Sequence, residues 1–298
     1  MIDVAVLMGG PDAERDVSIA SGTAIADALE TLGEYRVARH IIDRPRIEDL
    51  TALAADVVFP ALHGPFGEGG VLQEMLEGSG VCFVGSNAKA SALAMDKIAT
   101  KQRASSLGMR TPAWSSVGAD QSCGIEPPLM LKPVADGSSV DMRICRTAAE
   151  VSTGILNLSH RSSMMAESLV SGREVTVSVL EDEALPVLEI VPATGFYDYS
   201  AKYDRDDTRY VTDPDIDCRD LCQDQAMQLC RSIGVRDLAR VDYIVDDGGP
   251  WLLEVNTMPG FTTHSLFPMA AKAHGLDMPS LCSRLVLAAA RRHTPTHH

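Results

Sequence analysis

The stretch LLEVNTMPG, residues 252–260, places a carboxylate and an amide two positions apart, at Glu254 and Asn256. Side chains two residues apart on a strand point to the same face of a sheet. The preceding stretch ARVDYIVDDGGPW predicts the other strand of a hairpin and adds Asp242. Two carboxylates and an amide oxygen suit Mg²⁺ as ligands. The spacing alone is equally compatible with a polar face turned to solvent.

A lysine and a small turn suggest a second kind of chemistry. Lys132 stands in the apolar strand pattern LMLKPV, and Gly137-Ser138-Ser139 follows shortly after it. A lysine in a buried strand must reach solvent or find an anionic partner such as phosphate. Backbone N–H groups of a small turn can approach phosphate oxygens, although this one matches neither GxxxxGK[ST] nor GxGxxG and also fits an ordinary loop.

Other polar residues stand beside these groups or at predicted strand ends. Arg240 shares a strand face with Asp242 and can bring positive charge to the site. Glu14 follows the first predicted strand, where an acid suits either a helix N-terminus or a bound ammonium group. Four residues fit a structural or solvated role as well as a ligand-binding one: His63, Lys97, Glu167 and Glu174.

The elements that must position these residues follow from the hydrophobic pattern. Short apolar runs alternate with amphipathic segments, which predicts an α/β protein. Residues 1–95 are predicted to form one doubly wound unit, with strands at 4–8, 56–62 and 81–84 and helices at 17–32, 70–79 and, crossing its end, 89–107. From residue 129 strands dominate, followed by a helix at 221–233, a hairpin over 239–256 and a closing helix at 279–292. Residues 195–220 have few apolar anchors and predict a long surface loop.

Composition argues against several classes of protein. The 298 residues are 45% hydrophobic, which suffices for a large core, and the net charge of −15 without a basic stripe argues against nucleic-acid binding. No run of about 20 apolar residues occurs, so no membrane span is predicted. The start lacks the pattern of a secretory signal. Seven scattered cysteines predict free thiols in the cytoplasm rather than disulfides or a zinc site.

Seven motifs follow one another along the chain: MGGPDAERDVSIASG, FPALHGPFGEGG, LAMDK, KPVADGSSV, FYDYSAKY, ARVDY and LLEVNTMPGFTTHSL. From Val4 to about Arg292 their succession resembles the D-alanine–D-alanine ligases of the ATP-grasp superfamily. The resemblance implies three domains. These are an N-terminal doubly wound parallel sheet (1–95), a central α+β domain (96–180), and a C-terminal α+β domain with a mainly antiparallel sheet (181–298) and a lid loop at about 195–217.

The resemblance also implies an activity. ATP phosphorylates the carboxylate of one D-alanine, and the amine of a second attacks the acyl phosphate, which supplies peptidoglycan precursor. Implied as well are two Mg²⁺ ions, with Mn²⁺ or a monovalent cation as options, and a homodimer in the cytoplasm. Two alternatives stay open. One is a ligase for another D-amino or D-hydroxy acid pair, and the other is a nucleotide-binding relative with poor catalysis.

Residue roles carry over by motif. The metal ligands implied are Asp242, Glu254 and Asn256. The ATP site implied comprises Lys97, Lys132, Ser138, Ser139, Glu167, Ser168, Val170, Glu174, Phe196 and Lys202. The residues implied in catalysis or D-alanine binding are Glu14, His63, Ser138, Tyr203, Arg240, Gly260, Ser265 and Leu266. In this group Glu14 is implied to bind the ammonium group of the first D-alanine. Arg240 and the Gly260 N–H are implied to donate to its carboxylate and to the tetrahedral oxyanion, and Ser265 and the Leu266 N–H to hold the carboxylate of the second D-alanine.

The chain departs from the family pattern at two positions. Asp141 stands where the family has the last glycine of GSSVG, and Gly69 replaces the acid of GEDG. An aspartate at position 141 is strained if the backbone there has positive φ. Its carboxylate would repel phosphate if it pointed into the loop.

Overall fold

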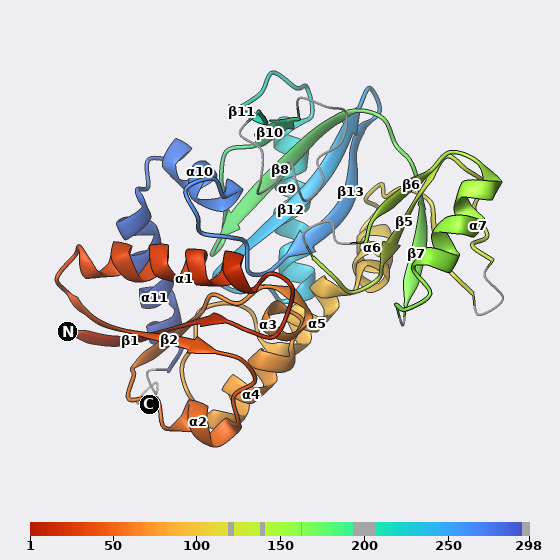
Figure 1. Ribbon diagram of the computed structural model, residues 1–298. Helices are drawn as coiled ribbons and strands as arrows, with labels where there is room; N and C mark the ends of the chain where they lie inside the picture. Colours follow the sequence, from red (N-terminus) through yellow and green to blue (C-terminus); the bar gives the residue numbers. More distant parts are fainter. Residues whose placement is uncertain (119–121, 138–140, 162, 193–206, 294–298) are drawn as a thin grey trace.

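The computed structural model describes residues 1–118, 122–137, 141–161, 163–192 and 207–293, whose strands form three sheets. In Figure 1 the large central sheet stands between the N-terminal layers and a smaller sheet at the right. No helix in this described part combines the length and apolar character needed to span a membrane. All seven cysteines lie within the described residues and are free thiols.

The first sheet, sheet A, is parallel and has the strand order β2–β1–β3. It consists of β1 (Ile2–Gly9), β2 (Tyr35–Ile42) and β3 (Val57–Pro60). Helices α1 (Arg15–Glu30) and α11 (Met278–His293) share one core with Val4 and Val6. Helices α2 (Ile47–Thr51) and α4 (Val71–Ser79) share another with Ala5 and Leu7. Both faces of the sheet are therefore buried, which confirms the doubly wound prediction.

Two details of this unit differ from the sequence expectation. The predicted strand at 81–84 is reduced to a single parallel bridge between Phe83 and Val58. The helix expected over 89–107 is in fact two helices, α5 (Ala88–Met95) and α6 (Lys97–Ser106). The break occurs because Asp96 has an extended backbone and its side chain accepts a hydrogen bond from the Ala99 N–H at 2.9 Å, as a strong N-cap does.

The small sheet, sheet B, is antiparallel and has the order β4–β7–β5–β6. Its strands are β4 (Trp114–Ser116), β5 (Leu129–Pro133), β6 (Arg143–Cys145) and β7 (Met164–Ser168). Helix α7 (Ala148–Asn157), which the hydrophobic pattern did not predict, covers one face through Val151 and Ile155. The backbone N–H of Lys97, at the start of α6, donates to the Val134 carbonyl just after β5 at 3.0 Å.

The central sheet, sheet C, is antiparallel and follows the path β11–β10–β8–β12–β13, with β9 paired to β8. Its strands are β8 (Arg173–Leu180), β9 (Glu183–Ala184), β10 (Leu188–Val191), β11 (Arg209–Thr212), β12 (Leu238–Asp246) and β13 (Gly249–Asn256). Strands β12 and β13 confirm the hairpin predicted over 239–256. Helix α9 (Arg219–Ile233) packs on the apolar face, and α10 (Leu266–Ala273) joins the core shared with sheet A.

Strand β11 corrects the expectation of a structureless segment over 195–220. Its sequence, RYVT, contains an aromatic and two β-branched residues, which favour a strand even in a polar stretch. Residues 193–206 lie outside the described part. The domain division after residues 95 and 180 stays a prediction; β8, which ends at Leu180, makes its strand pairs in sheet C.

The glycine at position 69 leaves no room for a side chain. It follows the short helix α3 (Gly64–Glu68), and a Cβ added to Gly69 would lie 2.3 Å from the Pro65 carbonyl oxygen. We predict that Gly69→Ala lowers the free energy of unfolding by about 1–3 kcal/mol, because α3 must shift to admit the methyl group. Urea denaturation of the purified chain measures this difference.

Gly78→Ala is the matched control. Gly78 is exposed on α4, and its added Cβ would meet nothing nearer than an Ile47 methyl carbon at 3.6 Å. This substitution should leave stability unchanged or raise it by up to about 1 kcal/mol. Equal destabilisation by the two alanines would contradict the steric argument.

Candidate functional site

Polar side chains gather on one face of the β12–β13 hairpin. The strand register places Arg240 opposite Asn256 and Asp242 opposite Glu254, with an irregularity immediately after Asp242. The other face is buried against α9. The alternation predicted for Glu254 and Asn256 is therefore present, and it turns both side chains toward a pocket that they line.

Arg240 and Asp242 form a paired unit on this face. The Arg240 Nε donates to Asp242 Oδ1 at 2.9 Å, and Nη2 donates to Oδ2 at 2.7 Å. Thr176, on the neighbouring strand β8, donates its hydroxyl to Asp242 Oδ1 at 2.6 Å. Such a two-pronged contact sets the orientation of both planar groups. The sequence prediction that Arg240 shares the face of Asp242 is confirmed.

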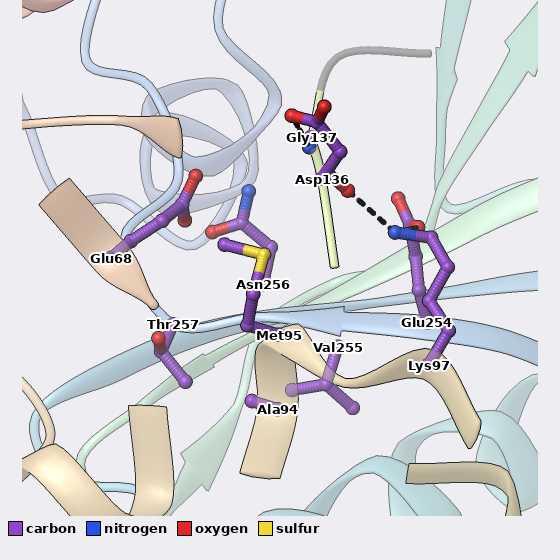
Figure 2. Close-up of a pocket in the computed structure, with 10 residues that line it drawn as sticks. All are labelled: Glu68, Ala94, Met95, Lys97, Asp136, Gly137, Glu254, Val255, Asn256 and Thr257. Atoms are coloured by element: carbon purple, nitrogen blue, oxygen red, sulfur yellow. Dashed lines mark hydrogen bonds and ion pairs between the residues drawn. The ribbon is translucent and has the colours of Figure 1, made fainter. Parts of the chain in front are cut away.

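Lys97 reaches the same pocket from the start of α6 (Figure 2). Its ammonium group donates to the Asp136 carbonyl oxygen at 2.5 Å and lies 3.3 Å from Glu254 Oε2. The side chain is buried, so the alternative of a solvated helix lysine is wrong. Because the helix breaks at Asp96, Lys97 stands at the first position of α6. From there its side chain contacts both the loop after β5 and the end of β13.

A second lysine cluster is buried beside this pocket. Lys132 Nζ donates to Glu167 Oε2 at 2.5 Å, and Lys101 forms an ion pair with the other carboxylate oxygen. Burial alone would raise the pKa of Glu167, but the charges of Lys132 and Lys101 outweigh it and lower that pKa. Burial lowers the pKa of Lys101 to about 8, against the opposing effect of Glu167. Lys101 was not singled out from the sequence, although its position one helical turn after Lys97 places it on the same side of α6.

Two acids approach the pocket from the N-terminal layers. Glu14 and Glu68 are both buried, and Glu68 Oε1 accepts the Gly64 N–H at 3.2 Å. Burial, and then the charge of Glu14, raise the pKa of Glu68 well above its ordinary value. A Cβ added to Gly137 would lie 3.1 Å from Glu14 Oε2, so the turn after β5 packs directly on this acid. Glu68 was missed because nothing in GEGG reveals which way a short helix faces.

His63 is fully buried and connects three segments. Its Nδ1–H donates to the Met258 carbonyl at 3.1 Å, so Nε2 accepts the Ser21 hydroxyl at 3.2 Å. Ser21 Oγ in turn accepts the Phe261 N–H at 3.1 Å. Burial lowers the pKa of His63 to about 4, and the charge of Arg240 acts in the same direction. The imidazole is therefore neutral near pH 7 and holds the turn around Gly260.

Gly260, Ser265 and Leu266 lie together after β13. A Cβ added to Gly260 would stand 2.7 Å from Ser265 Oγ, so a larger residue here would displace that hydroxyl. Ser265 Oγ accepts the Thr262 N–H at 3.0 Å, and Leu266 begins α10. The structure thus brings together the residues that were predicted for substrate binding on this side.

The remaining predicted residues are more widely spread. Glu174 is the second residue of β8, while Ser168 ends β7 and Val170 follows it in the loop between the two sheets. The Ser168 N–H donates to the Ala113 carbonyl at 2.8 Å and is engaged within the protein. Five predicted residues lie outside the described part of the chain: Ser138, Ser139, Phe196, Lys202 and Tyr203.

Asp141 has the positive φ that its glycine-like position suggested, at 55°. Its carboxylate accepts a hydrogen bond from Arg161 Nε at 2.6 Å and pairs with His160 at 3.2 Å. The Arg161 hydrogen bond holds the pKa of Asp141 below its ordinary value. Arg161 also donates to Asp136 at 2.8 Å. The negative charge at position 141 is thus compensated within the protein.

The oxygen ligands predicted for a metal fit a hard divalent cation. Asp242 and Glu254 face each other on paired strands, where like charges repel unless positive charge is supplied. Asn256 Oδ1 accepts the Met258 N–H at 2.8 Å and, as a carbonyl oxygen, has a second lone pair. Within the described residues, no three His, Cys, Asp or Glu side chains form a group that could hold a metal ion. The predicted set therefore depends on the amide of Asn256.

Comparisons with known proteins cover nearly the whole chain. The family described as "D-ala D-ala ligase C-terminus" matches residues 115–287. A D-alanine–D-alanine ligase of Syntrophotalea carbinolica is 39% identical over 97% of this chain and 96% of its own. One from Aquifex aeolicus is 38% identical over 95% and 99%.

Solved structures with the same fold cover a similar share of this chain. The D-alanine–D-alanine ligase of Bacillus anthracis complexed with ATP superimposes with a TM-score of 0.85 at 27% identity, over 98% of this chain and 99% of its own. The VanG D-Ala:D-Ser ligase of Enterococcus faecalis gives a TM-score of 0.82 at 26% identity, over 97% and 99%.

The buried histidine predicts a pH dependence of stability. The pKa of His63 is about 4 in the folded chain against 6.5 for an unperturbed histidine, so the unfolded chain binds the proton more readily between these values. Stability should therefore rise with pH from about 4 to 6.5, by up to about 3 kcal/mol from this group, and stay level above. Denaturation of His63→Gln at several pH values should lack this component. The exposed His264 supplies the control, since His264→Gln should keep the wild-type profile; identical profiles for all three proteins would rule out the assignment.

Proposed function

The chain belongs to the D-alanine–D-alanine ligase family, and we propose that it uses ATP to join two D-alanines through an acyl phosphate, for peptidoglycan synthesis. Its fold is that of the ATP-grasp ligases. The observation that carries the proposal is the pocket of Figure 2, where Lys97 pairs with Glu254 at one end, Glu68 lies at the other end, and Asn256 lies between them. A lysine, oxygen ligands and a buried acid in one pocket suit a nucleotide, a metal ion and an amino acid, respectively.

On the nucleotide side, we assign the phosphates to Lys97 and Lys132, with Lys202, Ser138 and Ser139 as further predicted contacts. Bound ATP supplies the phosphoryl group that activates the first carboxylate, and Mg²⁺ neutralises the phosphate charges. Asp242, Glu254 and Asn256 would hold the metal. Support comes from the register that aligns these strands and from the burial of both described lysines. Glu167, Ser168, Val170, Glu174 and Phe196 would line the adenosine side.

On the amino-acid side, Glu14 would bind the ammonium group of the first D-alanine. Arg240 and the Gly260 N–H would stabilise the oxyanion that forms when the second amine attacks, provided they face it in a closed, dry site. Ser265 and the Leu266 N–H would hold the second carboxylate, with Tyr203 and Ser138 completing the network around Glu14. His63 supports this arrangement because its hydrogen bonds reach both Met258 and, through Ser21, Phe261, which flank Gly260.

The proposal also includes the enzyme's localisation, its domain division, its oligomeric state and its cation requirements. We place the enzyme in the cytoplasm, because seven free thiols suit a reducing compartment. The division at residues 95 and 180, the lid at about 195–217 and the homodimer follow the family pattern. Two Mg²⁺ ions, their replacement by Mn²⁺ and a monovalent cation are further proposed requirements.

An ADP-release assay on a substrate panel tests the function. We expect ADP formation to require D-alanine and Mg²⁺, with D-alanyl-D-alanine identified as the product by mass spectrometry. D-serine and D-lactate, offered together with D-alanine as second substrates, test the alternative of another acid pair, since the VanG neighbour is named a D-Ala:D-Ser ligase. ATP binding without ADP release on any D-amino acid would instead favour the poorly catalytic relative.

The proposed metal ligand Glu254 allows a sharper prediction. Glu254→Gln keeps the size of the side chain but removes one carboxylate from the metal site. Metal ions contribute several kcal/mol of transition-state stabilisation, so kcat should fall at least about 100-fold, and the Mg²⁺ concentration for half-maximal rate should rise.

Asp247→Asn is the control for this change. Asp247 is exposed at the turn of the same hairpin, and its loss should leave both quantities near wild type. A Glu254→Gln enzyme with normal kcat and an unchanged Mg²⁺ requirement would remove Glu254 from the metal site.

A further inference from the structure

The buried cluster of Lys101, Glu167 and Lys132 contains one cation more than the carboxylate needs. The Lys101 side chain is fully buried, and those of Glu167 and Lys132 are only 5% and 4% exposed. Glu167 contacts one lysine through each oxygen. The proposed function gives roles to Lys132 and Glu167 but none to Lys101.

The two lysines differ in what else holds them. Lys101 Nζ also donates to the Thr111 hydroxyl at 2.8 Å and to the Leu252 carbonyl at 3.4 Å. These contacts hold its ammonium group against Thr111 and β13 independently of Glu167. Lys132 stands on β5, four residues before Asp136, which is one of the residues that line the pocket. Among the described residues, the side chain of Lys132 forms its hydrogen bond and ion pair with Glu167.

A lysine that binds a phosphate must give up part of its contact with Glu167. A buried carboxylate left without a partner is strongly unfavourable, and nucleotide binding would have to overcome that cost. Lys101 removes that cost, because it remains paired with the same carboxylate. Three buried charges are an expensive way to stabilise a fold, since apolar residues of the same volume do so as well or better.

We propose that Lys101 is a positioning residue for ATP: it keeps Glu167 neutralised and in place, so that Lys132 is free to bind the phosphates of the nucleotide. The inference rests on the proposed ATP site. It assigns Lys101 no contact with ATP, and its effect passes entirely through Glu167.

Nucleotide affinity without turnover tests the inference. Calorimetric titration of the full chain with a non-hydrolysable ATP analogue and Mg²⁺, in the absence of D-alanine, measures Kd directly. Lys101→Met should weaken binding at least about tenfold, because Lys132 must then stay with Glu167. In a Glu167→Gln background the same substitution should change Kd less than about threefold, because the amide needs no counter-charge.

Thr111→Val is the matched control. It removes a neutral hydrogen-bond partner of Lys101 while leaving the charge, and should keep Kd within about twofold. Thermal melting checks that each variant is folded. Should Lys101→Met fail to fold, Lys101→Gln replaces it in both backgrounds, because its amide can still donate to Thr111 and Leu252.

Each outcome has a distinct meaning. Unchanged Kd in Lys101→Met overturns the inference, and so does an equal loss in both backgrounds, which marks Lys101 as purely structural. Wild-type protein that binds no ATP analogue contradicts the proposed function itself, so the two failures are told apart.

Discussion

Carboxylates buried close to one another cost free energy unless positive charge accompanies them, and this constraint organises the whole pocket. Asp242 is hydrogen-bonded to Arg240, Glu254 forms an ion pair with Lys97, and Glu167 lies between two lysines. Glu68 responds differently: burial and the neighbouring charge of Glu14 raise its pKa. Three of these carboxylates are thus compensated by a cation of the protein itself, whereas Glu68 is compensated by its raised pKa.

The three sheets supply these charges from directions that no single sheet could provide. Sheet A and its connections place Glu14 and Glu68, sheet B carries Lys132 and Glu167, and sheet C carries Arg240 and its partners. Helix α6 links sheets B and C, because the backbone N–H of its first residue, Lys97, donates to the loop after β5 and the Lys97 side chain reaches β13. The site therefore exists only where the three units meet.

Much of this fold could be predicted locally. The hairpin of β12 and β13 and the buried strand β1 follow from alternation and apolar runs, which depend on neighbouring residues alone. The helix break at Asp96, helix α7 and strand β11 were not predicted. Asp96 was read as part of a continuous periodic pattern although it is a strong capping residue, and β11 is stabilised by pairing with β10, which local composition cannot reveal.

By itself the sequence determined the family, the order of the motifs and the polar face that carries Asp242, Glu254 and Asn256, because each depends on residue type and short spacing. Only the tertiary structure decided that Asp141 is paired with Arg161, that His63 is buried with a lowered pKa, and that Lys101 and Glu68 belong to the buried charge network. These properties depend on burial and on partners from distant segments. Electrostatic energies change several-fold between water and a protein interior, so the strength of a charged residue's interactions is set only once the chain has folded around it.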